Sequence, residues 1–202
     1  MNNDIPWKEA IDGLFVEFIG FFFPQAAADI DWARGVEFLD QELPPVLGDD
    51  LNGLLRVDKL AKVFRRSGMP LVVFVHVEVQ AQRDADFERR MFTYHYRIHD
   101  RFIKKDEAHQ VVSFAVLADA AAHWRPNCFG YSLWGFSLQM NFPSVKLLDW
   151  RGREAKLEAA SNPFAAIVLA HLQAVATKND PRTRFNVTLS YCKALFRKGY
   201  SS

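Results

Sequence analysis

Apolar residues recur every three or four positions in two stretches of the chain, a spacing that is typical of amphipathic helices. The first stretch predicts a helix that starts near Asp4 and Pro6 and ends at Pro24. Its apolar face consists of Trp7, Ile11, Leu14, Phe15, Phe18 and Phe22. The second stretch predicts a helix that starts near Asp84, with a buried stripe formed by Phe87, Met91, His95, Ile98 and Phe102.

Alternating and continuous apolar runs predict the strands. Residues 54–64 and 71–81 predict two strands, and the segment 66–70 between them, which contains Ser67-Gly68, is typical of a hairpin turn. Residues 111–117 are almost all apolar, as in a central strand that is covered on both faces. Residues 131–142 predict one or two further strands. The aromatic residues expected in the core are Trp124, Phe129, Tyr131, Trp134 and Phe136.

The remaining segments predict helices and a loop. Residues 35–43 predict a second, acidic helix that ends at Pro44, and residues 47–53 predict a loop. Near the end of the chain, Asn162 and Pro163 are suited to begin one helix, and residues 184–197 predict another. The order of helices and strands predicts an α/β or α+β domain with a mixed sheet.

Length and composition support a globular domain and exclude several classes of protein. The chain has 202 residues, of which 50% are hydrophobic and 14% aromatic, as expected for a packed core. Its apolar runs are too short to span a bilayer, so no membrane association is expected. The start of the chain does not resemble a signal peptide. Two cysteines without a CxxC pair argue against a disulfide framework or structural zinc and favour the cytoplasm.

Charge is distributed unevenly, although the net charge is only +1. Residues 1–50 contain 2 basic and 11 acidic side chains, residues 51–150 contain 14 and 10, and residues 151–202 contain 9 and 3. A basic C-terminal part is compatible with a surface that binds a polyanion such as DNA. Solvated helix surfaces explain the same asymmetry equally well.

The strand sequence LVVFVHVEVQAQ, residues 71–82, contains the residues most suited to chemistry. Because side chains alternate along a strand, His76, Glu78, Gln80 and Gln82 share one face with Phe74, opposite an apolar face of valines. A half-exposed sheet is one explanation for this alternation. The neighbouring elements are very hydrophobic, however, so a carboxylate on this face is expected to need a cation.

Asp58, in the string RVDKL of the preceding strand, completes a candidate metal site. Across a hairpin, Asp58 and Glu78 could lie side by side, where their negative charges would repel each other. A divalent cation removes that repulsion, and Mg²⁺ commonly binds one or two carboxylates together with water and substrate phosphate. The pair therefore predicts a site for phosphoryl chemistry.

Several strings resemble one known family. Asp58, followed after nineteen residues by Glu78-Val79-Gln80, is similar to the D…ExK motif of PD-(D/E)XK nucleases, with glutamine in the lysine position. The neighbouring strings are similar to those of the Rpn-type recombination-promoting nucleases, whose members are also described as transposases. These strings are PWKEAIDGLFVEFIGFFFP, IDWARGVEFLDQEL, VDKLAKV, HVEVQAQRDADFERRMFTYHYRIHDRF, WRPNCFGYSLWGF and FPSVKLLDW. The resemblance covers residues 4 to about 150.

The resemblance implies a restriction-endonuclease-like mixed β-sheet flanked by helices in residues 1–150, with C-terminal helices in 151–202 packed on it. It leaves open whether that C-terminal extension is truncated. The implied activity is Mg²⁺- or Mn²⁺-dependent hydrolysis of DNA phosphodiester bonds. Asp58, Glu78 and the backbone carbonyl of Val79 would bind the metal, with a further carboxylate from Glu9 on the first helix. Gln80 would position water, but it lacks the positive charge of lysine.

DNA contacts and the main alternative complete the hypothesis. Arg90 and Arg97 are seven residues apart on one helix face, so with Lys62 they could contact phosphates, unless they form ion pairs with nearby carboxylates. Glutamine at the lysine position and the low net charge instead favour a catalytically inactive DNA-binding or assembly domain from a mobile element. His95 and His99 have zinc-like spacing, but a core histidine or one with satisfied hydrogen bonds is expected. Whether the protein forms a homodimer stays open.

Overall fold

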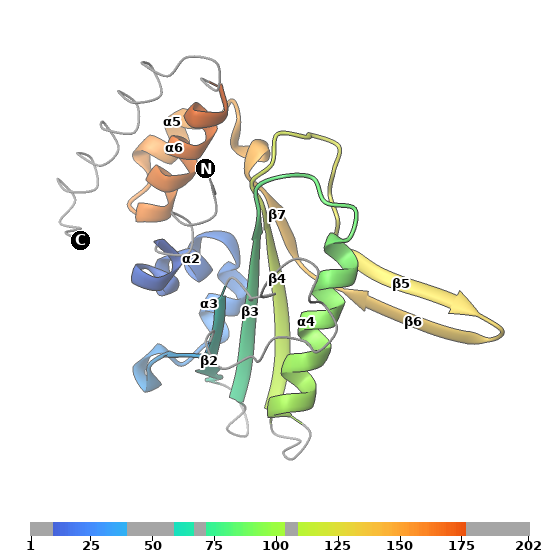
Figure 1. The fold of residues 1–202 in the computed structure, drawn as a ribbon. Coiled ribbons are helices and arrows are strands. Elements are labelled where there is room, and N and C mark those ends of the chain that lie inside the picture. The colour runs from blue at the N-terminus through green and yellow to red at the C-terminus, as the bar shows by residue number, and fades with distance from the viewer. Residues whose placement is uncertain (1–9, 40–58, 67–71, 104–108, 177–202) are drawn as a thin grey trace.

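A computed structural model describes residues 10–39, 59–66, 72–103 and 109–176 (Figure 1). Its helices are α2 (Phe15–Phe22), α3 (Pro24–Asp29), α4 (Phe87–Phe102), α5 (Glu154–Ala159) and α6 (Pro163–Ala176), with 3₁₀ helices η1 (Trp32–Arg34) and η3 (Leu147–Trp150). Its strands are β1 (Glu37–Phe38), β2 (Lys59–Phe64), β3 (Val72–Gln80), β4 (His109–Leu117), β5 (Cys128–Leu133), β6 (Phe136–Asn141) and β7 (Ser144–Lys146). The predicted loop at 47–53, the hairpin turn and the helix at 184–197 lie outside the described residues, apart from Arg66.

Five strands form a mixed sheet in the order β1-β2-β3-β4-β7. The pairs β1–β2 and β2–β3 are antiparallel, whereas the pairs β3–β4 and β4–β7 are parallel. Parallel neighbours need a crossover connection, and α4 provides it between β3 and β4. The predicted mixed sheet is therefore confirmed, and the apolar run at 111–117 is a central strand, as predicted.

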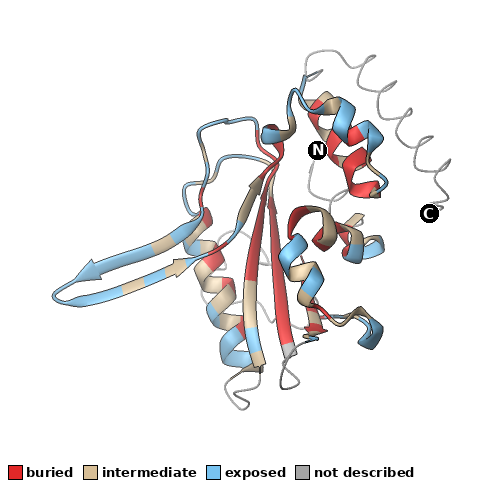
Figure 2. Cartoon of the chain, turned by 180° about the vertical axis from the view of Figure 1, so that it is seen from behind, coloured by how far each residue is buried: buried red, intermediate tan, exposed pale blue. Residues whose placement is uncertain are grey.

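Helices cover both faces of this sheet (Figure 1). On one face, the valines of β3 pack with α2, α3 and α6 in the largest apolar cluster, which includes Phe18 and Phe164. On the other face, α4 covers Phe74 and His76 with Tyr94 and Ile98. β3 and β4 are therefore mostly buried, as Figure 2 shows in red, and the half-exposed explanation of β3 is wrong.

The predicted end of the first helix at Pro24 and the start of a helix at Asn162 are confirmed. The first helix is not continuous, however, because Leu14 is a turn between helical residues 10–13 and α2. Its predicted start near Asp4 and Pro6 lies outside the described residues. α2 ends at Phe22, and Pro24 then opens the short helix α3. Asn162 caps α6, because its Oδ1 accepts a hydrogen bond from the Phe164 backbone N–H at 2.9 Å. The same side chain donates through Nδ2 to the Glu17 carbonyl at 2.9 Å, which ties the start of α6 to α2.

The acidic helix predicted over residues 35–43 is wrong in its described part. Residues Glu37 and Phe38 instead form the edge strand β1, paired with Lys62 and Ala61 of β2. An ion pair of 2.9 Å joins Glu37 to Lys62 across this edge. The sheet edge supplies hydrogen-bond partners that an isolated helical turn would lack, so tertiary pairing overrides the local preference.

β5 and β6 form a separate two-stranded sheet that projects from the body as an arm (Figure 1). Its turn has positive φ at both central residues, 52° at Trp134 and 85° at Gly135, as in a type I′ turn. At the base, the ring of Phe129 stacks on Phe92 of α4 with 4.9 Å between the ring centroids. This aromatic packing anchors the base of the arm on α4.

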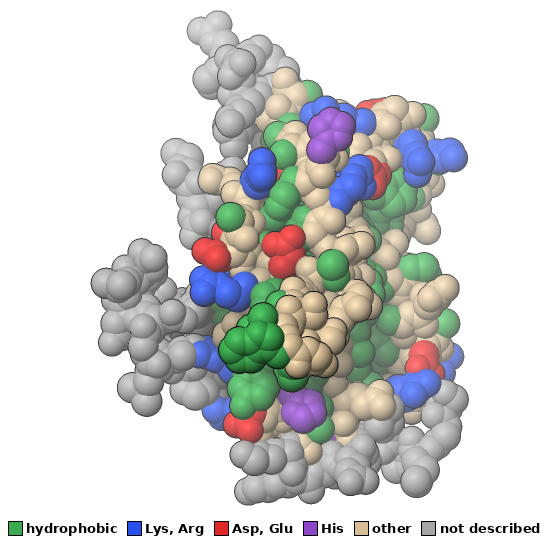
Figure 3. Space-filling view, turned by 90° about the vertical axis from the view of Figure 1, so that its right-hand side faces the viewer, with side chains coloured by type: hydrophobic (Ala, Val, Ile, Leu, Met, Phe, Trp, Pro, Cys, Tyr) green, Lys and Arg blue, Asp and Glu red, His purple; other side chains and the backbone are tan. Residues whose placement is uncertain are grey.

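The aromatic residues near the tip of the arm are exposed, which corrects the prediction that they belong to the core. Trp134 is 95% exposed, and Tyr131, Leu133 and Phe136 are each more than half exposed. Figure 3 looks onto the end of the arm, where hydrophobic side chains face the viewer. Alternating aromatic residues fit a strand in either place, so their pattern does not distinguish a core strand from this arm.

A buried ion pair lies where β4 and β7 end. The Lys146 Nζ is 2.5 Å from Asp119 Oδ2, and the two side chains are 1% and 2% exposed. Lys146 also donates to the Trp124 carbonyl at 3.2 Å, while Asp119 Oδ1 accepts from the Ala121 backbone N–H at 2.8 Å. These contacts fix the connection that leads from β4 toward the arm. No helix within the described ranges is long and apolar enough to cross a membrane.

Candidate active site

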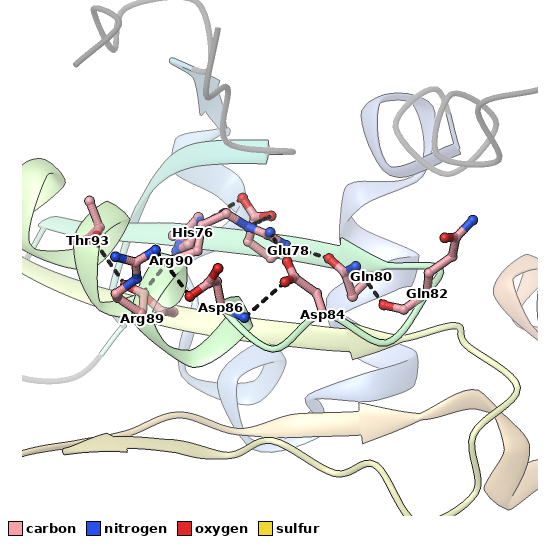
Figure 4. Close-up of polar contacts among 10 residues, drawn as sticks. His76, Glu78, Gln80, Gln82, Asp84, Asp86, Arg89, Arg90 and Thr93 are labelled. Atoms are coloured by element: carbon pink, nitrogen blue, oxygen red, sulfur yellow. Dashed lines mark hydrogen bonds and ion pairs between the residues drawn. The ribbon is translucent and has the colours of Figure 1, made fainter. Parts of the chain in front are cut away.

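Glu78 lies on the face of β3 that α4 covers, and it is only 4% exposed. Gln80 follows on the same face at the end of the strand, where it is half-buried. The chain then turns back through Asp84, whose Oδ1 accepts a hydrogen bond from the Asp86 backbone N–H at 2.9 Å. This turn begins α4 beside β3, so Arg90 on the second turn of the helix faces Glu78 and Gln80 (Figure 4).

Arg90 connects three polar side chains of this site. Its guanidinium donates to Gln80 Oε1 and to Asp84 Oδ2, and its Nε is 3.9 Å from Glu78 Oε2. Burial alone would lower the pKa of Arg90, but the negative charge of Glu78 and the hydrogen bond to Asp84 outweigh it. The pKa of Arg90 is therefore raised above its ordinary value. The guanidinium is a fixed positive charge at the end of β3.

Both ends of the Gln80 amide are engaged in the structure. Oε1 accepts from Arg90, and Nε2 donates to the Gln82 carbonyl at 2.6 Å. The amide is therefore held in one orientation by its own neighbours. A lysine at this position would bring a positive charge, and here Arg90 places one within hydrogen-bond reach of the same side chain.

A row of buried polar groups lies behind Glu78. The His76 ring is fully buried, with Nε2 3.3 Å from Glu78 Oε1 and Nδ1 3.1 Å from Ser113 Oγ. His95 of α4 reaches the same hydroxyl through its Nδ1, also at 3.1 Å. Burial first, and then the neighbouring His76 and His99, lower the pKa of His95, which favours its neutral form.

The predicted stripe of α4 needs one correction. Tyr94, not His95, is the buried member between Met91 and Ile98, and its ring packs edge-on against His76 with 5.5 Å between centroids. Since α-helical side chains three and four apart share a face, Tyr94 fits the stripe as well as its neighbour does. His95 is half-buried, and its ring forms a hydrogen bond with Ser113 instead of packing in the apolar stripe.

Two of the predicted metal ligands, Asp58 and Glu9, lie outside the described residues. The backbone carbonyl of Val79 is another predicted metal ligand, and Val79 is buried in β3 between Glu78 and Gln80. Asp12, another acidic residue of the first helix, forms an ion pair with the buried Lys59 of β2.

The predicted DNA-binding residues lie apart. Arg90 forms ion pairs with Asp84 and Glu78, which is the predicted alternative to phosphate contact. Lys62 pairs with Glu37 at the far edge of the sheet. Arg97 is half-buried on α4, about 10 Å along the helix axis from Arg90. Of the three, the structure brings only Arg90 to the candidate site.

The donor set for a metal is incomplete within the described residues. Among them, no group of three or more His, Cys, Asp or Glu side chains is placed to hold a metal ion. Glu78 supplies one buried carboxylate, and Asp84 a second that is held by Arg90. Carboxylate oxygen suits Mg²⁺ or Mn²⁺, so the chemistry of this part of the site fits such an ion.

Two residues of the site were not predicted from the sequence. Asp84 could have been noticed as the first residue of a D-x-D turn before a helix, and Ser113 as the one polar residue within the apolar run 111–117. Together, the site combines a buried carboxylate, a fixed guanidinium and a row of hydrogen-bonded groups, and it can attract a cation and contact an anion. Compared with known proteins, the chain matches no family model, no curated protein and no solved structure.

Proposed function

We propose that this protein is a metal-dependent DNA endonuclease of the PD-(D/E)XK type, which hydrolyses phosphodiester bonds with Mg²⁺ or Mn²⁺. The observation that carries the proposal is the buried Glu78 beside the Arg90 guanidinium, which itself holds Gln80. A carboxylate taken out of water needs a cation nearby. Glu78, Asp84 and Arg90 together carry a net charge of −1, so the group still favours a further cation.

The metal would be held by Glu78, Asp58 and the carbonyl of Val79, with Glu9 as a further ligand. The described ladder between β2 and β3 pairs Lys59 with Val77. The proposal requires that pairing to continue by one step, which would bring Asp58 beside Glu78. When bound, the metal supplies a lowered pKa for its water and stabilises negative charge on the phosphoryl oxygens.

The protein's own side chains have distinct roles in this proposal. Glu78 binds the cation and is kept in place by His76, and Gln80, held by Arg90, orients the attacking water. The Arg90 guanidinium provides the positive charge beside the scissile phosphate that lysine would otherwise provide. Arg97 and Lys62 would contact phosphates farther along the DNA. The order of β2, β3, α4 and a parallel β4 is compatible with a restriction-endonuclease-like fold.

A second candidate is a catalytically inactive DNA-binding or assembly domain. The observation that favours it is the closed pairing of Arg90 with Asp84 and Gln80, which satisfies these groups without any ligand. In that case the cluster has a structural role, and Glu78 is simply a buried partner of His76 and Arg90.

Nicking of supercoiled plasmid distinguishes the two. The full chain is expected to nick plasmid in Mg²⁺ or Mn²⁺ but not in EDTA. Glu78→Gln, which keeps the shape but removes the charge, should reduce the rate by about 10²-fold or more. Asp58→Asn should have a similar effect. Glu158→Gln, at an exposed position on α5, is the control and should nick like the wild type.

The second candidate predicts a different outcome. A folded wild type that shifts plasmid in a gel without metal, and never nicks it, would establish binding without cleavage. Equal nicking by the wild type and Glu78→Gln would show that the activity does not use this site.

A further inference from the structure

Four side chains from three elements form a continuous row of hydrogen-bond contacts behind Glu78. His76 is two residues from Glu78 on the same face of β3, and its Cα partner across the ladder is Ser113 of β4. His95 reaches Ser113 from α4. The three contacts measure 3.3 Å from Glu78 Oε1 to His76 Nε2, then 3.1 Å and 3.1 Å on either side of Ser113 Oγ.

The chemistry of these groups allows one consistent direction of donation when both imidazoles are neutral. A carboxylate only accepts, so His76 must donate from Nε2 to Glu78, and its Nδ1 is then an acceptor. Ser113 has a single O–H, which it must give to His76 Nδ1. The Ser113 oxygen can then accept from His95, whose proton must therefore be on Nδ1. The lowered pKa of His95 agrees with a neutral ring.

We propose that Ser113 and His95 are positioning residues that orient His76 and, through it, the Glu78 carboxylate. The proposal rests on the proposed function, since it assigns the row a purpose only if Glu78 is a metal ligand. Oε1 of Glu78 is 3.3 Å from His76 Nε2, and Oε2 is 3.9 Å from Arg90 Nε. In the proposed function, the contact with His76 fixes the rotation of the carboxylate that would bind the cation. Groups behind a ligand commonly fix its orientation and strengthen metal binding.

His76 and Ser113, at the centre of the row, are too buried to contact DNA directly. His76 has no exposed surface, and Ser113 is 4% exposed. Tyr94 packs edge-on against the His76 ring and limits its rotation. The side chain of Ser113 is therefore connected to Glu78 through the imidazole of His76.

The first test measures the tautomers, which do not depend on activity. Imidazole ¹⁵N chemical shifts of the full chain without metal should show His76 protonated on Nε2 and His95 protonated on Nδ1. A neutral histidine in water is protonated mainly on Nε2, so finding the proton of His95 on Nδ1 would indicate a specific hydrogen bond. Ser113→Ala should release His95 from the Nδ1–H form. A wild-type His95 protonated on Nε2 beside a neutral His76 would overturn the proposal, because Ser113 has only one O–H and could not then bond both rings.

The second test measures the affinity for Mn²⁺ alone by calorimetry. Ser113→Ala is expected to raise the Kd about tenfold, while Ser113→Thr, which keeps the hydroxyl, should stay near the wild type. Ser144→Ala, on the neighbouring strand β7, is the matched control and should leave the Kd unchanged. Near-UV circular dichroism confirms that each variant is folded.

The two tests separate the failures. An unchanged Kd in folded Ser113→Ala would overturn the positioning role. A wild type that binds no Mn²⁺ would overturn the proposed function itself, and the tautomers would then still decide whether the row holds Glu78.

Discussion

Lys146→Ala is expected to destabilise the protein by about 3–5 kcal/mol. The substitution leaves the Asp119 carboxylate buried without its cation, because both side chains of this pair are almost fully enclosed. It also removes the donor to the Trp124 carbonyl. A loss of this size is a large part of the stability of an ordinary domain. The free energy of unfolding in urea, compared with the wild type, measures it.

The double variant Lys146→Met with Asp119→Asn tests the cause. It removes both charges, but asparagine can still accept the hydrogen bond from the Ala121 backbone N–H. More than half of the lost stability should return, since replacing both partners is far less harmful than removing one. Lys156→Ala, at an exposed position, should change stability by less than about 0.5 kcal/mol. If Lys146→Ala were as mild as Lys156→Ala, the pair would not be buried in solution.

Arg90→Met is expected to reduce metal-dependent nicking by about 10²–10³-fold, the loss typical of removing one fixed donor from an active site. Methionine fills similar space but removes the charge and releases Gln80. Glu78 and Asp84 then lie together without the guanidinium, so metal affinity should not fall in parallel with the rate. The rate constant for nicking at saturating Mn²⁺, beside the Kd for Mn²⁺, separates the two effects.

Two matched variants test whether the expected loss of nicking comes from the position of Arg90. Arg90→Lys keeps the charge but not the forked geometry, so it should recover only part of the rate. Arg89→Met changes the adjacent arginine, which is 69% exposed and pairs with Asp86 on the helix surface, and it should nick like the wild type. Equal losses in the Arg89 and Arg90 variants would point to a general electrostatic effect on DNA binding.

The elements with a long regular pattern could be predicted from the sequence. Alternation over nine residues defined β3, and the apolar stripe from Phe87 defined α4. β1 could not be predicted, because two residues carry no pattern and their strand exists only at the edge of β2. The position of the arm outside the core could not be predicted, because its aromatic residues resemble those of a buried strand. The turn at Trp134 and the pairing of β5 with β6 alone in a separate sheet are seen in the structure of the described residues.

The candidate site was predictable in part for the same physical reason. Strand periodicity placed His76, Glu78 and Gln80 on one face, and the structure agrees. The partners come from other elements. The position of Ser113 beside His76 depends on the register between β3 and β4. The contact of Arg90 with Gln80 depends on how the turn at Asp84 places α4 beside β3. Neither the register nor the packing of α4 can be obtained from residue spacing.

The arm also affects how the protein behaves at high concentration. Within the described residues, β5 and β6 pair only with each other, so each has an outer edge that could accept another strand. Residues 128–141 include no Asp, Glu, Lys, Arg, His or Pro, the residues that commonly prevent such pairing. Trp134 and its neighbours add exposed apolar surface at the tip. An apparent molecular mass that rises with protein concentration is the solution behaviour to which this geometry leads.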